Sequence, residues 1–268
     1  MNILDELAAY ARTRVENNKC LHPTEELRAA AYAMEKGDFS FEKALAKEEM
    51  SFICECKKAS PSKGIIAEDF PYLDIAKAYE AAGADAISVL TEPKWFLGSD
   101  QYLKEITEAV SIPVIRKDFT VDEYMIYEAK LLGASAVLLI VSILSEEQIR
   151  KYIGICDELG LSALVECHDA EEIDTALRAG ARIIGVNNRN LKDFSVDITL
   201  SGGLRDRVPD NIIFVSESGV KDAGDVRRMR ESGADAVLVG EALMRSEDKA
   251  QMLKEFKEAA NSCHSGLM

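Results

Sequence analysis

The chain has 268 residues, of which 47% are apolar and 29% are charged, a composition typical of a globular protein in water. It carries 32 lysines and arginines against 47 aspartates and glutamates, so its formal net charge is −15. This acidity argues against a nucleic-acid or an anionic-membrane partner, because both are bound through clustered basic side chains. An anionic small molecule would therefore need a local cationic pocket.

The first residues and the cysteines indicate a cytoplasmic protein. Charged residues interrupt Met1 to Lys19, so we expect no secretory signal peptide there, and no apolar run approaches the length of a transmembrane helix. The cysteines lack the spacing of a zinc site and are expected to be reduced thiols that pack as small hydrophobic groups: Cys20, Cys54, Cys56, Cys156, Cys167 and Cys263. No metal site is expected either, because the histidines are dispersed: His22, His168 and His264.

Three helical segments precede the first predicted strand. Apolar residues recur at helical spacing from Met1 to Lys19, and a second helix is predicted from Thr24 to Lys36. Phe39 to Glu49 is predicted as a third, short element. We therefore expect residues 1–50 to form a helical N-terminal extension.

From Phe52 onward, apolar strands alternate with helical patterns. The strand starts lie roughly 20 to 34 residues apart, which leaves room for a crossover helix each time. The strands are continuously apolar, as expected when both faces of a parallel sheet are covered. The predicted strands are Phe52–Cys56, Ala86–Leu90, Pro113–Lys117, Ala136–Val141, Ala163–Cys167, Ile183–Asn187, Ile212–Ser216 and Ala236–Gly240. Helical patterns between them include Tyr72–Ala82, Val121–Leu132, Glu146–Leu159 and Ala223–Glu231.

A glycine–alanine signature recurs where a predicted helix meets the next strand, at Gly83, Gly133, Gly180 and Gly233. The glycine fits the left-handed position that ends a helix. Eight strand–helix units, without a dinucleotide-binding or phosphate-loop glycine motif, favour a closed barrel over a doubly wound sheet. The predicted fold class is α/β, a (β/α)8 TIM barrel. We expect residues 1–268 to form one barrel domain that carries the extension, and we expect no organic cofactor.

Polar and charged residues stand at the C-terminal ends of the predicted strands, where such barrels build their active sites. Glu55 and Lys57 are two residues apart, so both side chains point to the same side of the first strand. Carboxylates and lysines that converge in one funnel perturb one another's pKa, as acid–base chemistry requires. The same spacing recurs in Lys117 with Phe119 and in Asn187 with Arg189. The other strand-end positions are Thr91, Glu92, Ser142, Glu166, Glu217, Ser218, Gly240 and Glu241.

The seventh and eighth units differ in character from the others. Ser216-Glu217-Ser218-Gly219-Val220 and Val239-Gly240-Glu241-Ala242 place small residues where backbone N–H groups can face an anion. In (β/α)8 enzymes the loops after strands seven and eight often hold a phosphate. We expect Gly219 and Gly240 to keep the place of that anion free of side chains.

The motifs of the barrel resemble those of a known family. Glu55-Cys-Lys57-Lys-Ala-Ser60-Pro61-Ser62 is similar to the Glu-x-Lys-x-x-Ser-Pro-Ser motif of the indole-3-glycerol phosphate synthases. The resemblance covers the whole barrel, and the helical extension is also similar to that of the family. Further matching motifs are Leu90-Thr91-Glu92 with Phe96-x-Gly98-Ser99, Pro113-Val-Ile-Arg-Lys117-Asp118-Phe119, Leu164-Val165-Glu166, Gly185-Val-Asn187-Asn-Arg189, Ser216-Glu217-Ser218-Gly219 and Val239-Gly240-Glu241.

The resemblance implies a carbon–carbon lyase of tryptophan biosynthesis. Its substrate would be the anionic phosphate 1-(2-carboxyphenylamino)-1-deoxyribulose 5-phosphate, and its products indole-3-glycerol phosphate, CO2 and water. Lys117 is similar to the proposed acid of the family, with Lys57 as a second cation, and Glu166 matches the proposed base. We expect Lys57 to lower the pKa of Lys117. Lys117 and Glu166 are expected to approach the substrate from different sides of the funnel.

The resemblance also suggests roles for the surrounding residues. Carboxylates and an amide would orient the lysines and the substrate hydroxyls: Glu55, Asn187 and Glu217. Two aromatic rings, Phe96 and Phe119, would pack against the anthranilate ring. Arg189 and Lys57 are candidates for its carboxylate. The phosphate would be held by Ser218, Gly219, Gly240 and the backbone of Glu241, with Ser60 as a helper.

Several alternatives remain open at this point. Another phosphate-binding barrel enzyme, notably phosphoribosylanthranilate isomerase, would work with a cysteine and an aspartate. A non-catalytic ligand-binding barrel would be expected to lack some of the ionisable strand-end residues. Ser60 to Gly64 is either a lid or an ordinary surface loop, and His168 is either a proton shuttle or a structural histidine. A monomer or a weak homodimer is expected.

Overall fold

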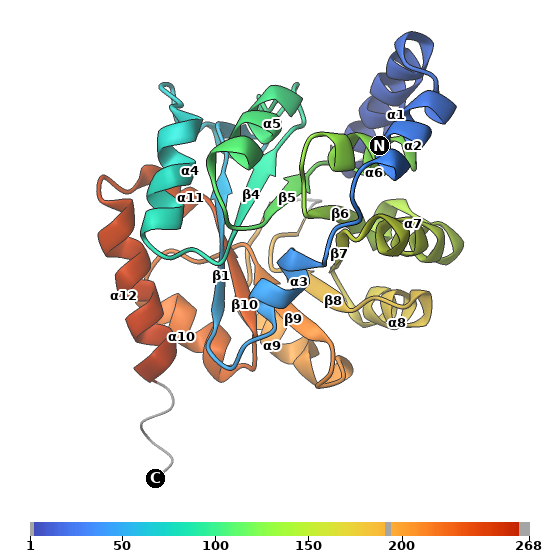
Figure 1. Cartoon of the computed structure of the whole chain (residues 1–268). Coiled ribbons are helices and arrows are strands. Elements are labelled where there is room, and N and C mark those ends of the chain that lie inside the picture. The colour runs from blue at the N-terminus through green and yellow to red at the C-terminus, as the bar shows by residue number, and fades with distance from the viewer. Residues whose placement is uncertain (1–2, 191–193, 263–268) are drawn as a thin grey trace.

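The computed structural model describes residues 3–190 and 194–262. Its centre is a closed barrel in which all eight strands run parallel, in the order β1-β10-β9-β8-β7-β6-β5-β4 (Figure 1). The predicted (β/α)8 fold is confirmed, and each strand end lies within one residue of its predicted place. The barrel strands are β1 (Ser51–Cys56), β4 (Ala86–Leu90), β5 (Val114–Lys117), β6 (Ala136–Ile140), β7 (Ser162–Cys167), β8 (Ile183–Asn187), β9 (Ile213–Glu217) and β10 (Ala236–Val239).

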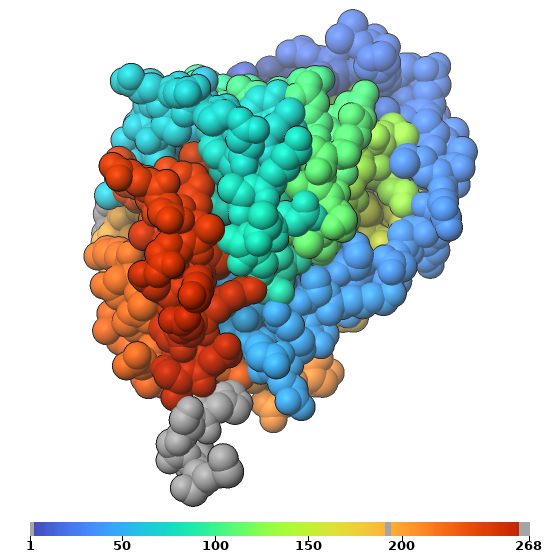
Figure 2. All heavy atoms as spheres, turned by 60° about the vertical axis from the view of Figure 1, so that its left-hand side comes forward, coloured from blue at the N-terminus to red at the C-terminus, as the bar shows by residue number. Residues whose placement is uncertain are grey.

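Helices connect successive strands and cover the outside of the barrel. Figure 2 shows one such covered face, where α12 lies beside α4. The predicted bounds of α7 and α10 are confirmed, whereas α6 begins three residues later than predicted, after a turn in which Oδ1 of Asp122 accepts the backbone N–H of Tyr124. The connecting helices are α4 (Tyr72–Ala81), α5 (Asp100–Ala109), α6 (Tyr124–Leu131), α7 (Glu146–Leu159), α8 (Ala170–Ala179), α9 (Thr199–Leu204), α10 (Ala223–Glu231) and α12 (Lys249–Asn261). Shorter elements are the 3-10 turns η1 (Val141–Ile143) and η2 (Arg205–Arg207) and the helix α11 (Glu241–Arg245).

The joins between helices and strands have the predicted chemistry. The glycines of the repeated signature all adopt positive φ angles, between 83° and 94°: Gly83, Gly133, Gly180 and Gly233. An L-residue with a β-carbon is strained in this conformation, so these positions select glycine. Each of these short turns is followed directly by a buried strand.

The third helix of the extension, α3 (Ser40–Leu45), lies at the amino-terminal end of the barrel. Its backbone contacts the first residues of two strands: the N–H of Glu42 donates to Oγ of Ser162 at 3.2 Å, and Oγ of Ser51 donates to the carbonyl of Ala44 at 3.2 Å. Phe41 is fully buried in the cluster that fills the barrel interior. This helix therefore closes the end of the barrel opposite the expected active site, and it is shorter than the predicted 39–49 element.

The first helix, α1 (Ile3–Leu21), lies at the carboxyl end instead, next to α2 (Thr24–Ala33) (Figure 1). Leu4 and Leu7 are buried in the same interior cluster as the strand residues. Arg14 makes a bidentate ion pair with the fully buried carboxylate of Asp118 just after β5, with N–O distances of 2.6 and 3.1 Å. Because the extension covers both ends of the barrel, we propose that the extension and the barrel fold as a single domain.

The described cysteines are free thiols. Cys54, Cys56, Cys156 and Cys167 are buried and Cys20 is exposed, while Cys263 and His264 lie outside the described residues. Burial raises the pKa of the Cys54 thiol, which keeps it protonated and unreactive. Over residues 3–190 and 194–262, none of the helices is both long and apolar enough to span a membrane.

Candidate active site

A cavity of about 770 Å³ opens at the carboxyl ends of the strands, and every barrel strand contributes to its wall. This volume suits a small phosphorylated molecule. All the site residues named from the sequence line it: Glu55, Lys57, Ser60, Phe96, Lys117, Phe119, Glu166, Asn187, Arg189, Glu217, Ser218, Gly219, Gly240 and Glu241. Of the other strand-end positions, Thr91, Glu92 and Ser142 do not reach the cavity.

Glu55 and Lys57 form an ion pair inside the cavity, as their spacing on β1 predicts. Burial raises the pKa of the Glu55 carboxyl, but the charges of Lys57 and Lys117 outweigh this effect, so the net pKa lies below its ordinary value. Although Glu55 is only 3% exposed, the two lysines therefore keep its carboxylate ionised inside the barrel. A β-carbon on Gly240 would collide with Oε1 of Glu55 and lie 3.0 Å from Nζ of Lys57. Gly240 thus makes room for this ion pair, a role that differs from the expected clearance for an anion.

Lys117 stands between two buried carboxylates. Its Nζ lies 3.3 Å from Oε2 of Glu166 and 3.5 Å from Oε2 of Glu217. Burial lowers the pKa of Lys117, but Glu166, Glu217 and Glu55 together raise it by more, so the net pKa is above the ordinary value. The expectation that Lys57 lowers the pKa of Lys117 is therefore wrong, because the nearby carboxylates dominate. The expectation that Lys117 and Glu166 stand on different sides of the funnel is also wrong, since they are in contact.

Glu166 and Glu217 have opposite pKa shifts although both are buried. For Glu166 the effect of burial is outweighed by Lys117, by His168 and by a hydrogen bond from Asn187, so its pKa is lowered. For Glu217 burial and the neighbouring carboxylates prevail over Lys117 and raise the pKa to about 8. At neutral pH Glu166 is therefore a carboxylate, whereas Glu217 carries a proton. Environments that separate two carboxyl pKa values in this way are typical of acid–base sites.

Gly185 of β8 makes room for Glu217. A β-carbon at this position would collide with Oε1 of Glu217, an atom that is buried and accepts no hydrogen bond from any described residue. The sequence analysis did not single out Gly185, although it stands in one of the matching motifs. A glycine inside a continuously apolar strand is a signal that another group approaches the backbone closely.

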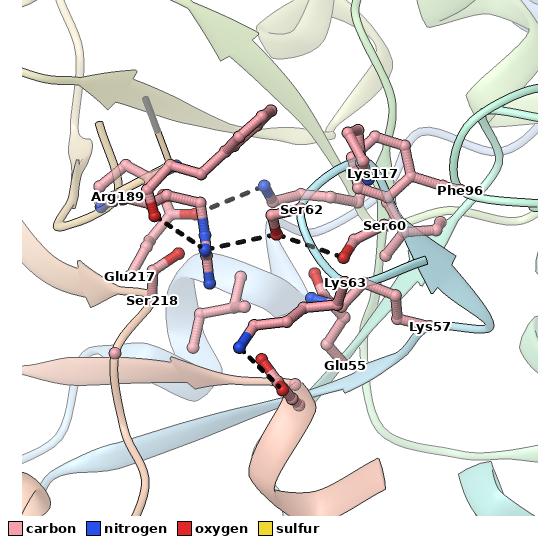
Figure 3. A pocket seen from close by; sticks show the side chains of 18 of the residues that line it. Glu55, Lys57, Ser60, Ser62, Lys63, Phe96, Lys117, Arg189, Glu217 and Ser218 are labelled. Carbon is pink, nitrogen blue, oxygen red and sulfur yellow. Dashed lines mark hydrogen bonds and ion pairs between the residues drawn. The ribbon is translucent and has the colours of Figure 1, made fainter. Parts of the chain in front are cut away.

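Arg189 connects the barrel to the segment after β1. Its guanidinium donates to Oγ of Ser62 at 3.4 Å and to the carbonyl of Phe194 at 3.3 Å, and Ser62 in turn lies 3.5 Å from Oγ of Ser60 (Figure 3). The side-chain oxygen of Asn187 accepts the backbone N–H of Arg189 at 3.0 Å and so shapes this turn. The arginine therefore faces the cavity from a fixed backbone.

The segment from Ser60 to Gly64, expected to be either a lid or an ordinary surface loop, belongs to a small antiparallel ladder in which β2 (Ala59–Ser60) pairs with β3 (Gly64–Ile65). Two-residue strands leave too little alternation for a sequence pattern to reveal them. Lys63 at the tip lies 3.6 Å from the carboxylate of Glu241 in α11. This hairpin covers one side of the cavity, and Ser62 and Lys63 are lining residues that the sequence analysis missed.

The apolar wall of the cavity combines the barrel with the extension. The rings of Phe96 and Phe119 are 6.1 Å apart at an angle of 43°. Ile3, Leu4 and Leu7 of α1 line the same cavity. Helical periodicity in the extension predicts an apolar face, but it does not indicate that this face reaches the site.

Glu92 supports the loop that carries Phe96. Its buried carboxylate accepts three successive backbone N–H groups, from Lys94, Trp95 and Phe96, at 2.8 to 2.9 Å. These bonds fix the turn after β4 and aim the aromatic ring at the cavity. Glu92 is thus a structural carboxylate although it stands at a strand end.

The segment after β9 has an unusual backbone. Ser218 and Gly219 follow one another with φ angles of 66° and 98°. Asn188, which is 1% exposed, donates to the carbonyl of Ser218 at 3.1 Å and to Oγ of Ser216 at 3.0 Å. A β-carbon on Gly219 would lie 2.6 Å from a methyl group of Ile198. The turn is therefore held in one conformation, with Ser218, Gly219 and Val220 lining the cavity next to Gly240 and Glu241.

Within residues 3–190 and 194–262, no three histidine, cysteine, aspartate or glutamate side chains gather in a way that could hold a metal ion. The chemistry that the arrangement does offer is acid–base chemistry. Two lysines and three carboxyl groups meet in a cavity with one aromatic side and another side formed by Ser218, Gly219, Gly240 and Glu241.

Comparison with known proteins shows which family the chain is similar to. Residues 4–256 match the family model of indole-3-glycerol phosphate synthase. The chain is 57% identical over 259 residues to the indole-3-glycerol phosphate synthase of Ruminiclostridium cellulolyticum, with 96% of this chain and 100% of the relative covered. It is 51% identical over 261 residues to that of Lacticaseibacillus casei, again with 96% and 100% covered.

Solved structures of low sequence identity share the fold alone. Thiamine phosphate pyrophosphorylase from Pyrococcus furiosus superposes with a TM-score of 0.62 at 16% identity, over 83% of this chain and 98% of that one. A mandelate oxidase bound to benzoyl-formic acid gives a TM-score of 0.57 at 19% identity, over 71% and 67% of the two chains. The near full-length relatives and the family model are decisive, and the chain belongs to the indole-3-glycerol phosphate synthase family.

Proposed function

We propose that the cavity described above carries out the reaction of the family, in which 1-(2-carboxyphenylamino)-1-deoxyribulose 5-phosphate becomes indole-3-glycerol phosphate, CO2 and water. The observation that carries the proposal is the contact of Lys117 with Glu166 and Glu217 at the centre of the cavity. This cluster places a charged ammonium, an ionised carboxylate and a protonated carboxyl within reach of one bound molecule.

The shape of the cavity supports one orientation of the substrate. The anthranilate ring would lie against Phe96, Phe119 and the apolar face of α1, with its carboxylate near Arg189 and Lys57. The phosphate would lie at the wall formed by Ser218, Gly219 and the start of α11 at Gly240, whose backbone N–H groups would bind it. Ser60 also lines the cavity and would help to hold the phosphate.

In the first step the aromatic carbon that bears the carboxylate attacks the ribulose carbonyl carbon. The new carbon–carbon bond forms as the carbonyl π-bond breaks, and the oxygen takes a proton from Lys117. Glu166 and Glu217 hold the ammonium of Lys117 in place, and the ionised Glu166 keeps it charged until the oxygen becomes basic. Loss of CO2 then returns the bonding electrons to the ring and restores its aromaticity.

In the second step the hydroxyl leaves as water and a proton is removed from the substrate. Glu166 is the base, because its lowered pKa keeps it ionised. Lys57, held by Glu55, is the second ammonium able to protonate the departing hydroxyl. The electrons of the broken C–H bond, on the carbon between the nitrogen and the carbon that loses the hydroxyl, form the new carbon–carbon double bond, which completes the indole. Asn187 holds the carboxylate of Glu166 through its hydrogen bond.

The isomerase alternative fits this cavity poorly. That reaction class uses a cysteine with an aspartate, and among the described lining residues there is no cysteine. The aspartate in the wall, Asp118, is engaged by Arg14 and by Thr91, whose hydroxyl donates to it at 2.6 Å. The ionisable residues expected to be missing from a non-catalytic barrel are all present.

The experiment is to incubate the purified chain with the carboxyphenylamino-deoxyribulose phosphate and to follow indole fluorescence together with CO2 release. We expect both products in equal amounts. Turnover of phosphoribosylanthranilate without indole formation would favour the isomerase, and binding without turnover would favour the ligand-binding barrel. We further propose a cytoplasmic enzyme that is a monomer or a weak homodimer, which light scattering over a range of concentrations would measure.

A further inference from the structure

His168, the first residue after β7, is held by Glu172 from the first turn of α8. Oε2 of Glu172 accepts the backbone N–H of His168 at 2.7 Å and its ring Nδ1 at 3.2 Å. Ser142 of η1 donates to the other oxygen of Glu172 and lies 3.3 Å from Nδ1. Because a carboxylate accepts hydrogen bonds, the ring carries a hydrogen on Nδ1. Its other nitrogen is thereby left without a hydrogen in the neutral ring.

That other nitrogen, Nε2, faces Glu166. It lies 3.4 Å from Oε1 of Glu166, is buried, and has no hydrogen-bond partner elsewhere in the described part of the chain. Oε2 of the same carboxylate contacts Lys117. Glu166 therefore stands between Lys117 on the cavity side and His168 behind it. His168 does not line the cavity, so it can act on a bound molecule only through Glu166.

The charges around the ring favour a proton on Nε2. The ionisable groups that face His168 are Glu166 from β7, Glu172 from α8 and Glu217 from β9. Burial lowers the pKa of His168, but these carboxylates raise it by more, so the net pKa is above its ordinary value. Before the reaction, the lone pairs of the ionised Glu166 and of the neutral Nε2 lie against each other. The proton that Glu166 takes from the substrate relieves this repulsion when it lies between Oε1 and Nε2.

We propose that His168, positioned by Glu172, accepts the proton that Glu166 removes from the substrate. The inference rests on the proposed function, in which Glu166 is the base. The O–H bond formed on Glu166 breaks, an N–H bond forms on Nε2, and Glu166 becomes a carboxylate again beside an imidazolium. The proton returns through Glu166 to water once the product has left the cavity. Throughout, Nδ1 keeps its hydrogen bond to Glu172, so the ring needs no reorientation.

His168→Asn tests the proton-accepting role, because the amide can still donate to Glu172 in place of Nδ1 but offers nothing at the position of Nε2. We expect kcat to fall by about 10- to 100-fold with little change in KM. We also expect the wild-type kcat to fall on the acid side below the pKa of His168, since an imidazolium cannot take a second proton, and this fall to be absent in the variant. Full activity of a folded His168→Asn would overturn the proposal.

Glu172→Gln tests the positioning role. Removing this carboxylate destabilises the imidazolium, so the acid-side fall of kcat should move to lower pH, whereas Glu171→Gln on the exposed face of the same turn should leave it in place. A purely structural role would lower activity or stability without moving the pH profile. An unmoved profile in Glu172→Gln would therefore contradict the proposal.

NMR gives a readout that does not depend on turnover, because the chain has three histidines. The ring of His168 should show the Nδ1–H tautomer and titrate above the usual histidine value, and Glu166→Gln should lower that value. If His168 has the same pKa in Glu166→Gln as in the wild type, the proposed interaction between His168 and Glu166 is wrong. If His168→Asn is active while Glu166→Gln is not, the proposed proton transfer from Glu166 to His168 is wrong and the proposed function is unaffected.

Discussion

The Nζ atom of Lys117 lies 3.3 Å from Oε2 of Glu166, although the two residues come from strands separated by β6. The proposed acid and the proposed base of the reaction are thus direct partners. Each keeps the other charged: the carboxylate raises the pKa of the lysine, and the ammonium lowers the pKa of the glutamate. A bound substrate has to enter this contact, so binding and proton transfer are linked.

Lys117→Met and Glu166→Gln should each lower kcat by about 10²- to 10⁴-fold, the usual contribution of a general acid or base. Methionine keeps the bulk of lysine without a proton to donate, and glutamine is nearly isosteric with glutamate. Because the two groups are in contact, the double variant should lose less than the product of the two single losses. Steady-state kinetics of the three proteins measure this, and strictly multiplicative losses would show that the residues act independently.

Glu217→Gln should stabilise the fold increasingly as the pH rises. The unfolded carboxyl loses its proton near pH 4.3 whereas the folded one keeps it up to about pH 8, so the folded state loses stability relative to the unfolded state as the pH rises through this window. Glutamine removes that penalty. The Tm of the variant should equal that of the wild type near pH 4 and exceed it at pH 8, by about 2–4 °C per kcal/mol relieved.

The matched control is Glu147→Gln on the exposed face of α7, which should show no such trend. Thermal melts by circular dichroism between pH 4 and 9 give the comparison. An increase in Tm that is the same at every pH would mean that Glu217 is ionised in the folded protein, against the raised pKa argued above.

Gly219→Val and Gly240→Val should impair the reaction in different ways. At Gly219 the new side chain meets Ile198 and Val196 and distorts the turn proposed to hold the phosphate, so KM should rise. At Gly240 it displaces Glu55 and Lys57, so kcat should fall as well. Kinetics of both variants, with inorganic phosphate as a competing ligand, separate the two effects. Unchanged KM in folded Gly219→Val would place the phosphate elsewhere.

Catalysis should need no metal ion and no organic cofactor. The acids and cations of the cavity already supply each proton transfer in the proposed reaction. Activity should survive dialysis against EDTA without loss. Activity that disappears on this treatment and returns only with a divalent ion would contradict the prediction.

The sequence predicted the barrel and the residues that line its mouth because both follow from local rules. Alternation along β1 places Glu55 and Lys57 on one side, and strand ends converge in any closed barrel. The contact between Lys117 and Glu166 depends on the register of three strands, which no local pattern encodes. The same holds for Gly185, which is a glycine because of a carboxylate from the neighbouring strand.

The extension illustrates a second limit of sequence analysis. Its helices were predicted from apolar spacing, but spacing does not say what an apolar face covers. Leu4 and Leu7 reach the cavity because Arg14 of α1 is tied to Asp118 at the end of β5, a pairing between residues more than a hundred positions apart. A related limit explains why the pKa of Lys117 is raised and not lowered as expected. The sequence shows which charged residues are present, but it does not show their distances from Lys117.

The central claim is that Lys117 acts before CO2 is lost and Glu166 acts after it. A single-turnover experiment with substrate labelled in the carboxyl carbon tests this directly, by following labelled CO2 and indole fluorescence in the same sample. Glu166→Gln should release about one equivalent of CO2 per site well before indole appears, whereas Lys117→Met should release neither. If Glu166→Gln retains its labelled carboxyl, or if Lys117→Met releases CO2 without forming indole, the assignment of the two residues is wrong.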